Sequence, residues 1–128
     1  MVDIDAVITE YLETQPGLTV HTQERLYASI SLPKGYDPSN GKALLFNVRG
    51  GTPDYSSLVL RPSMQFRSVG KTEAEARELD RALFDALNDA SYCKIKMAQL
   101  ETIGQLLRFP ATGWPFVLSF YRLFISAN

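Results

Sequence analysis

The sequence contains only one cysteine and one histidine among its 128 residues. A lone cysteine, Cys93, cannot form an internal disulfide, so the protein suits a reducing compartment. The sequence also has no histidine pair, no C-x-x-C and no clustered carboxylate loop, which are the usual patterns of zinc and calcium ligands. We therefore expect no metal site and no cofactor.

The sequence also has almost no net charge and no long apolar run. Thirteen basic and fourteen acidic side chains leave a formal charge of −1, which gives no electrostatic footprint for nucleic acid or an anionic membrane. The first twelve residues, MVDIDAVITEYL, lack the basic segment and apolar core of a signal peptide. The longest apolar-rich run, residues 114–125, is interrupted by Ser119 and Arg122 and is too short to cross a bilayer as a helix. The remaining class is a folded soluble protein, and 128 residues suffice for one domain spanning residues 1–128.

Two segments have the periodicity of amphipathic helices. In residues 3–14 the apolar side chains recur at the spacing of a single buried face, Asp3 is placed to cap the start, and Pro16-Gly17 is expected to end the helix. The second helix is expected from about residue 73 to residue 89. Its apolar stripe consists of Ala76, Leu79, Leu83, Phe84, Leu87 and Ala90.

Other segments have the composition of β-strands. Residues 18–32 are apolar and partly β-branched, residues 43–48 are continuously apolar, and residues 33–42 between them have the composition of a surface loop. From Leu58 onward apolar and polar side chains alternate, which predicts a half-buried strand, and Pro62 within it indicates an edge or a bulge.

The C-terminal third predicts a β-hairpin. Residues 95–109 and 115–126 are expected to be its strands, with PATGW at 110–114 as the connection. The last strand is apolar on both faces, with Phe116, Leu118, Phe120 and Phe124 on one and Val117, Tyr121, Leu123 and Ile125 on the other. Such a strand is either central in a packed sheet or presented to another subunit.

The stretch FRSVGKTEAEA, residues 66–76, resembles a phosphate-binding loop because Gly70-Lys71-Thr72 precedes a helix. That motif also needs a glycine five residues before Gly70, where the backbone curls around the phosphate, and this position is Gln65. The alternative explains each residue: Gly70 ends the strand, Thr72 caps the helix, and Glu75 completes a capping box. We expect the structural role and no nucleotide hydrolysis.

Two other features are weaker candidates for a functional site. His21 and Cys93 are the only available base and thiol nucleophile, and nothing in the sequence places them together. In NVRGG, residues 47–51, the paired glycines predict a turn or bulge, with close approach to a neighbouring chain as the functional alternative. We therefore expect no catalytic residues and no enzymatic activity.

The order of these features resembles the tail terminator family of long-tailed bacteriophages, also known as tail completion, minor capsid or head–tail joining proteins. The resemblance covers most of the chain and is carried by architecture rather than by a catalytic motif. The residues that carry it are Gly50-Gly51 followed by a Pro-Asp turn, and the strand–turn–helix MQFRSVGKTEAEARELDRALFDAL.

The resemblance implies an α+β fold in which a mainly antiparallel sheet packs against two α-helices. It also implies a ring, with six subunits expected, that sits on the last tail-tube layer, stops polymerisation and presents a surface for head attachment. The implied partners are further copies of the chain, the tail tube protein and a head connector or stopper protein, with no membrane and no sequence-specific nucleic acid, although DNA would pass through the lumen. The implied location is the head–tail junction of the virion, and the host cytoplasm during assembly.

Two alternatives stay open at this point: another neck or head–tail connector component, or a non-enzymatic α+β oligomerisation or binding module. For assembly, we expect one surface to meet either another subunit or the tail tube. Its expected residues are Arg49, Gly50, Gly51, Asp54, Arg61 and Arg67. Paired glycines suit close backbone approach, and the planar arginine fork suits carboxylates of a neighbour, whereas the simpler alternative is that these arginines are only solvated.

Overall fold

The computed structural model describes residues 3–53, 59–92 and 94–126. One five-stranded sheet, ordered β1-β2-β3-β5-β4, is antiparallel except for the parallel β1–β2 pair. The α+β fold with a mainly antiparallel sheet is therefore confirmed. In chain order the elements are α1 (Ile4–Glu13), α2 (Pro16–Thr22), β1 (Leu26–Tyr27), the 3-10 helix η1 (Pro38–Asn40), β2 (Ala43–Pro53), β3 (Val59–Val69), α3 (Glu73–Leu87), β4 (Ile95–Arg108) and β5 (Pro115–Ser126).

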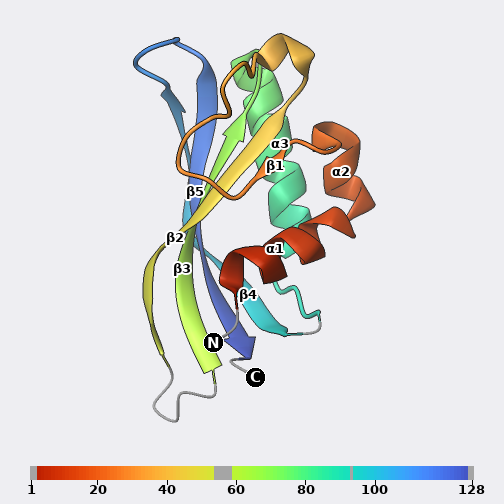
Figure 1. Ribbon diagram of the computed structural model, residues 1–128, viewed down its shortest axis with the longest axis vertical. Coiled ribbons are helices and arrows are strands. Elements are labelled where there is room, and N and C mark those ends of the chain that lie inside the picture. Colours follow the sequence, from red (N-terminus) through yellow and green to blue (C-terminus); the bar gives the residue numbers. More distant parts are fainter. Residues whose placement is uncertain (1–2, 54–58, 93, 127–128) are drawn as a thin grey trace.

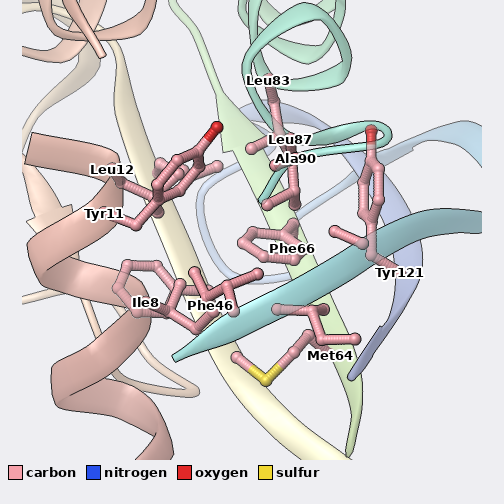
Figure 2. Close-up of a cluster of buried hydrophobic side chains, with 14 of the residues drawn as sticks. Ile8, Tyr11, Leu12, Phe46, Met64, Phe66, Leu83, Leu87, Ala90 and Tyr121 are labelled. Carbon is pink, nitrogen blue, oxygen red and sulfur yellow. The ribbon is translucent and has the colours of Figure 1, made fainter. Parts of the chain in front are cut away.

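The α-helices lie on one side of the sheet, and β2 and β3 run on past the end of the helical layer (Figure 1). The main core fills the space between the two layers. Figure 2 shows Phe66 of β3 among side chains from α1, α3 and β5. Its ring centroid lies 5.9 Å from that of Phe46 and 5.4 Å from that of Tyr121, which meets it edge-on. Because this cluster joins every layer, it fixes the sheet against the helices.

Both predicted helices begin where their caps indicate. Asp3 accepts a hydrogen bond from the Ala6 amide at 3.2 Å, and Thr72 accepts one from the Glu75 amide at 3.2 Å. Residues 66–69 continue strand β3, as expected, so no loop precedes Lys71. Gly70 has a further role, because a Cβ there would lie 2.6 Å from the Ala76 backbone nitrogen.

The expectation of a strand over residues 18–32 is wrong for most of its length. Residues 16–22 form helix α2, which starts at Pro16, and only Leu26–Tyr27 pair as a strand. Pro16 is tolerated at the first position of a helix because that amide lacks an intrahelical partner, so here it starts a second helix instead of only ending the first. Leu18 is fully buried in the main core, which stabilises a segment of modest helix propensity.

Strand β2 is longer than expected, because RGG does not end it. The register shifts between Val48 and Gly50, and Gly50 has a φ of 139°. The predicted bulge is therefore confirmed, but it lies within the strand, which continues to Pro53. A Cβ at Gly50 would meet no atom within 4 Å, so within the described residues its backbone conformation, and not a close approach, favours glycine here.

Strand β3 is central, so the expectation of an edge at Pro62 is wrong. The pairing of β3 with β5 includes Leu60 with Ile125 and resumes with Ser63 and Arg122, so the ladder is interrupted at Pro62. The interruption accommodates a residue that has no amide hydrogen to donate.

The expected C-terminal hairpin is confirmed, and its last strand has two different faces. Tyr121, Leu123 and Ile125 are buried under the helices. The alternate residues point to the other side of the sheet, which no helix among the described residues covers (Figure 1). We call this side the open sheet face.

Candidate assembly surface on the open sheet face

Strand β5 places a row of aromatic side chains on the open sheet face. Phe116 is largely buried, whereas Leu118, Phe120 and Phe124 are half-buried. In the register of the sheet, Gln65 and Arg67 of β3 stand beside Phe120 and Leu118. Apolar and cationic side chains are thus interleaved across the centre of the sheet.

Three arginines lie over these three rings. The guanidinium carbon of Arg49 lies 3.9 Å from the Phe120 centroid. The corresponding distances are 5.7 Å from Arg61 to Phe124 and 5.9 Å from Arg67 to Phe116. Such cation–π contacts contribute roughly 0.5–1 kcal/mol each at exposed sites. They also hold the planar guanidinium groups in fixed places over the rings.

Position along the strands decides which arginine meets which ring. The rings follow one another at every fourth residue of β5, which keeps them on one face. Arg61 and Arg67 come from β3, whereas Arg49 comes from the bulged part of β2. A bulge redirects the side chains beside it, and Arg49 reaches across β3 to the ring on β5.

Glu101 of β4 forms the polar centre of the open sheet face. Its carboxylate accepts a hydrogen bond from the Ser63 hydroxyl at 2.7 Å and one from Arg122 at 2.9 Å. Arg49 approaches the same carboxylate at 3.7 Å. The Ser63 hydrogen bond and the two guanidinium groups lower the pKa of Glu101, so it is charged at neutral pH.

A second feature of this side is a pocket of about 540 Å³ at the end nearest the 110–114 turn. Its walls come from the segment before η1 and from the β4–β5 hairpin, and include Tyr36, Trp114 and Phe116. Arg67 belongs to both the pocket and the open sheet face, and it donates a hydrogen bond to the Ile30 carbonyl at 2.6 Å. Burial raises the pKa of Tyr36 to about 12, and its hydroxyl donates to the Gly41 carbonyl at 2.6 Å.

The structure brings together three of the residues expected from the sequence, Arg49, Arg61 and Arg67, on one face. Gly50 and Gly51 lie in the bulged part of β2, next to Arg49. Asp54 lies outside the described residues, so its expected place at this surface is untested. Sequence reasoning did not single out Glu101, although its position in the expected strand at 95–109 was a signal.

The other candidate pair does not form a described site. Cys93 lies outside the described residues, so its distance from His21 is untested. His21 instead meets an ion pair, with its Nδ1 atom 3.2 Å from the Glu78 carboxylate and 3.0 Å from the Lys42 ammonium. Lys42 itself lies 2.6 Å from Glu78. This cluster ties α2 and the segment before β2 to α3.

The described part of the chain brings together no group of three or more histidine, cysteine, aspartate or glutamate side chains suited to a metal ion. Over residues 3–53, 59–92 and 94–126, no helix combines the length and the hydropathy needed to cross a membrane.

Comparison with known proteins gives a fold likeness without a sequence match. No family model and no curated protein matches the chain. A protein in the virion of a native gene transfer agent particle has a similar fold, with a TM-score of 0.67 and 12% identity over 97% of this chain and 95% of that one. The bacteriophage SPP1 gp17 protein is also similar, with a TM-score of 0.58 and 16% identity over 98% of this chain and 90% of that one. At such low identities the likeness establishes the shared fold.

Proposed function

We propose that this chain is a structural virion protein at the head–tail junction of a long-tailed phage or phage-like particle. In this role copies form a ring, with six subunits expected, on the last layer of the tail tube. The ring stops tail polymerisation and presents a surface to the head connector or stopper protein. DNA passes through its lumen without sequence-specific contacts, and the chain itself catalyses no reaction.

The fold supports this proposal. One solved structure with a similar fold is part of the virion of a gene transfer agent particle, and another is a bacteriophage protein. The likeness extends over nearly the whole chain in both cases. The same arrangement was expected from the order of elements in the sequence.

The open sheet face carries the functional part of the proposal. An antiparallel sheet with helices on one side normally presents polar side chains to water on the other. Here that side carries Phe116, Phe120 and Phe124, each with an arginine over its ring. Aromatic residues and arginine are enriched in protein interfaces and among the residues that dominate binding energy. We therefore assign the open sheet face to contact with another virion subunit.

The proposed contact residues are those expected from the sequence. Arg49, Arg61 and Arg67 supply the charges, while Gly50 and Gly51 shape the strand beside them. Asp54 completes the set as a proposal from the sequence alone. Planar guanidinium groups held on aromatic rings are suited to carboxylates of a neighbouring subunit.

Charge reversal tests this assignment. We expect Arg61→Glu, and separately Arg67→Glu, to fold normally but to give tails of irregular length or tails that fail to join heads. Arg77→Glu is the matched control, because Arg77 is an exposed arginine on α3, away from the open sheet face. Electron microscopy of particles made with each variant measures tail length and head attachment, and circular dichroism checks folding.

The outcomes separate the alternatives. Normal tails joined to heads with both sheet variants would show that the assigned surface is wrong. Tails of uniform length that fail to join heads would instead favour a connector component of the neck. Irregular lengths with the sheet variants and normal particles with Arg77→Glu are the result that the terminator role requires.

A further inference from the structure

The pocket beside the 110–114 turn has the size and the lining of a binding site. Its volume of about 540 Å³ lies within the range of roughly 300–1,000 Å³ that ligand sites occupy. Aromatic, aliphatic and proline side chains form most of its wall, and Arg67 is the only charged residue among those that line it. Such a pocket suits an apolar group that lies next to a negative charge.

The charge of Arg67 is not balanced within the chain. Its guanidinium donates a hydrogen bond to the Ile30 carbonyl at 2.6 Å and lies over the Phe116 ring, and both of these partners are uncharged. Across residues 3–53, 59–92 and 94–126, no carboxylate forms a salt bridge with Arg67. Arg67 also lies eight residues along β3 from Val59, or about 26 Å at 3.3 Å per residue, so it is far from the start of that strand. A carboxylate from outside the chain is the expected counterpart.

The walls of the pocket are held in place by contacts within the chain. The ring of Tyr36 meets that of Trp114 edge-on, with 6.0 Å between their centroids. On the side of the hairpin, Arg108 donates a hydrogen bond to the Gly113 carbonyl at 2.8 Å and another to the Glu73 carboxylate at 2.8 Å. Because these walls are already ordered, binding in the pocket costs little conformational entropy.

Helix α3 carries the matching chemistry at Phe84 and Asp85. The periodicity of the helix places Phe84 in its apolar stripe, yet 39% of Phe84 is exposed. Among the described residues it is the one aromatic side chain in the set of exposed large hydrophobic residues. The adjacent Asp85 is also exposed, and in the part of the chain that the structure describes it forms no salt bridge. An exposed phenylalanine followed by a carboxylate is the combination that the pocket suits.

Phe84 cannot reach the pocket of its own copy. The ion pair between Arg108 and Glu73 fixes the start of α3 against the hairpin that forms one wall of the pocket. From there α3 runs toward the other end of the molecule (Figure 1). Phe84 lies eleven residues after Glu73, or about 16 Å along the helix at 1.5 Å per residue. Only a second copy of the chain can bring this phenylalanine to the pocket.

We propose that Phe84 of one copy inserts into the pocket of the next copy, where Asp85 pairs with the guanidinium of Arg67. This inference rests on the proposed function and deepens it, because it names a contact that joins copies within the ring. The contact is heterologous, since each copy offers its helix to one neighbour and its pocket to the other, and such contacts close into a ring when the rotation between copies allows. Aromatic anchors in pockets and desolvated arginine pairs are the contacts that dominate binding energy.

Other occupants would satisfy fewer of these features. A small aromatic carboxylate would fill the pocket but would leave Phe84 exposed on the helix. A nucleic acid binds through several cations along its backbone, and the lining of the pocket supplies one. A second copy covers the aromatic pocket, the exposed phenylalanine and both unpaired charges at once.

Two measurements on the full chain test the contact. Sedimentation velocity up to about 1 mM protein measures association, because this is the concentration range of the weakest specific contacts. Quenching by acrylamide of the fluorescence of Trp114, the single tryptophan, shows whether the pocket is covered, because Trp114 forms part of its wall. Circular dichroism checks the folding of every variant.

Three variants perturb the contact from both sides. Phe84→Ala removes the anchor, Asp85→Arg sets two cations against each other, and the double variant Arg67→Asp with Asp85→Arg exchanges the two charges. The matched controls lie on the first two helices. Val20→Ala removes an apolar side chain of α2 that is 71% exposed, and Glu13→Arg reverses an exposed charge on α1.

The parent and both controls should associate as concentration rises, and Trp114 should become harder to quench. Phe84→Ala and Asp85→Arg should each associate at least about tenfold more weakly, with Trp114 still open to acrylamide. The double variant should associate again, because the two charges are once more complementary. A parent that stays monomeric at about 1 mM, a Phe84→Ala variant that associates like the parent, or a folded double variant that does not recover would each overturn the proposal.

Further outcomes separate this inference from the role on which it rests. If the parent stays monomeric while 3-phenylpropionate protects Trp114 from acrylamide, the pocket takes a different partner and the contact between copies is wrong. If Phe84→Ala leaves association unchanged while Arg61→Glu still produces irregular tails, the contact is wrong and the terminator role stands. If Phe84→Ala abolishes association and tails made with it are uniform and joined to heads, the contact stands and the terminator role fails.

Discussion

Replacing Gly70 by alanine should destabilise the fold, because this glycine lies against the first turn of α3. A Cβ at this position would be 2.6 Å from the Ala76 backbone nitrogen and 2.8 Å from the Glu75 Cβ. Real side chains essentially never approach so closely, and the helix backbone cannot move aside without breaking its cap at Thr72. Overpacking of this kind costs roughly 1–3 kcal/mol of the free energy of unfolding.

The matched control is Gly17→Ala in α2. A Cβ at Gly17 would meet no atom within 4 Å, and alanine restricts the unfolded chain more than glycine does. The same substitution should therefore stabilise the protein there, by about 0.4–1 kcal/mol. The same glycine-to-alanine change is thus expected to lower the free energy of unfolding at position 70 and to raise it at position 17.

Urea unfolding followed by fluorescence of Trp114, the single tryptophan, measures both changes. Gly70→Ala should lower the midpoint with an unchanged slope, and Gly17→Ala should raise it. A Gly70→Ala variant as stable as the parent would refute the packing role.

Three further predictions concern the helix that Gly70 precedes. Thr72→Ala should lower the free energy of unfolding by roughly 1 kcal/mol through loss of the cap to the Glu75 amide, and a thermal melt identical to that of the parent would contradict this. Lys71→Ala should change stability by less than about 0.5 kcal/mol, and calorimetry should show no magnesium-dependent ATP or GTP binding that depends on this lysine. Burial raises the pKa of Asp80 in the folded state, so the charged carboxylate opposes folding. The free energy of unfolding of the parent should therefore fall relative to that of Asp80→Asn as pH rises from about 3.9, the ordinary pKa of aspartate, through the raised pKa of the folded state. Urea unfolding at a series of pH values measures the free energy of unfolding of both proteins. A difference between them that does not change with pH would show that the pKa of Asp80 is not raised by folding.

The parts of the fold that sequence predicts are those with local causes. Helix α3 has a cap, an apolar stripe and charged residues on its outer side, and its observed start at Glu73 follows from Thr72. The β4–β5 hairpin follows from two apolar strands around a turn that contains Gly113, which has a φ of 76°. In both cases neighbours in sequence supply the decisive contacts.

The parts that sequence misses depend on distant contacts. Helix α2 has seven residues and includes Thr19 and Val20, which favour strands, yet it forms because Leu18 is buried in the core shared with α3. Pro62 lies in a central strand because the neighbouring strand leaves a gap in its hydrogen bonding at that point. Neither compensation is visible in the residues themselves.

The candidate site shows the same division. Alternation along β3 places Arg61 and Arg67 on one side, and it also separates the two faces of β5. The pairing of each arginine with a particular phenylalanine depends on strand order and on the β2 bulge, which are tertiary features. Glu101 lies where the β4–β5 register shifts, between Leu100 and Thr102, so strict alternation does not predict its direction.

The length of tails assembled without this chain tests the central claim most directly. Particles are produced from a genome in which its reading frame is deleted, with and without the parent protein supplied in trans, and tail lengths are measured by electron microscopy. The account predicts tails of irregular length that lack heads, and restoration of uniform, head-bearing tails by the parent protein. Uniform tails joined to heads in the absence of the chain would contradict it.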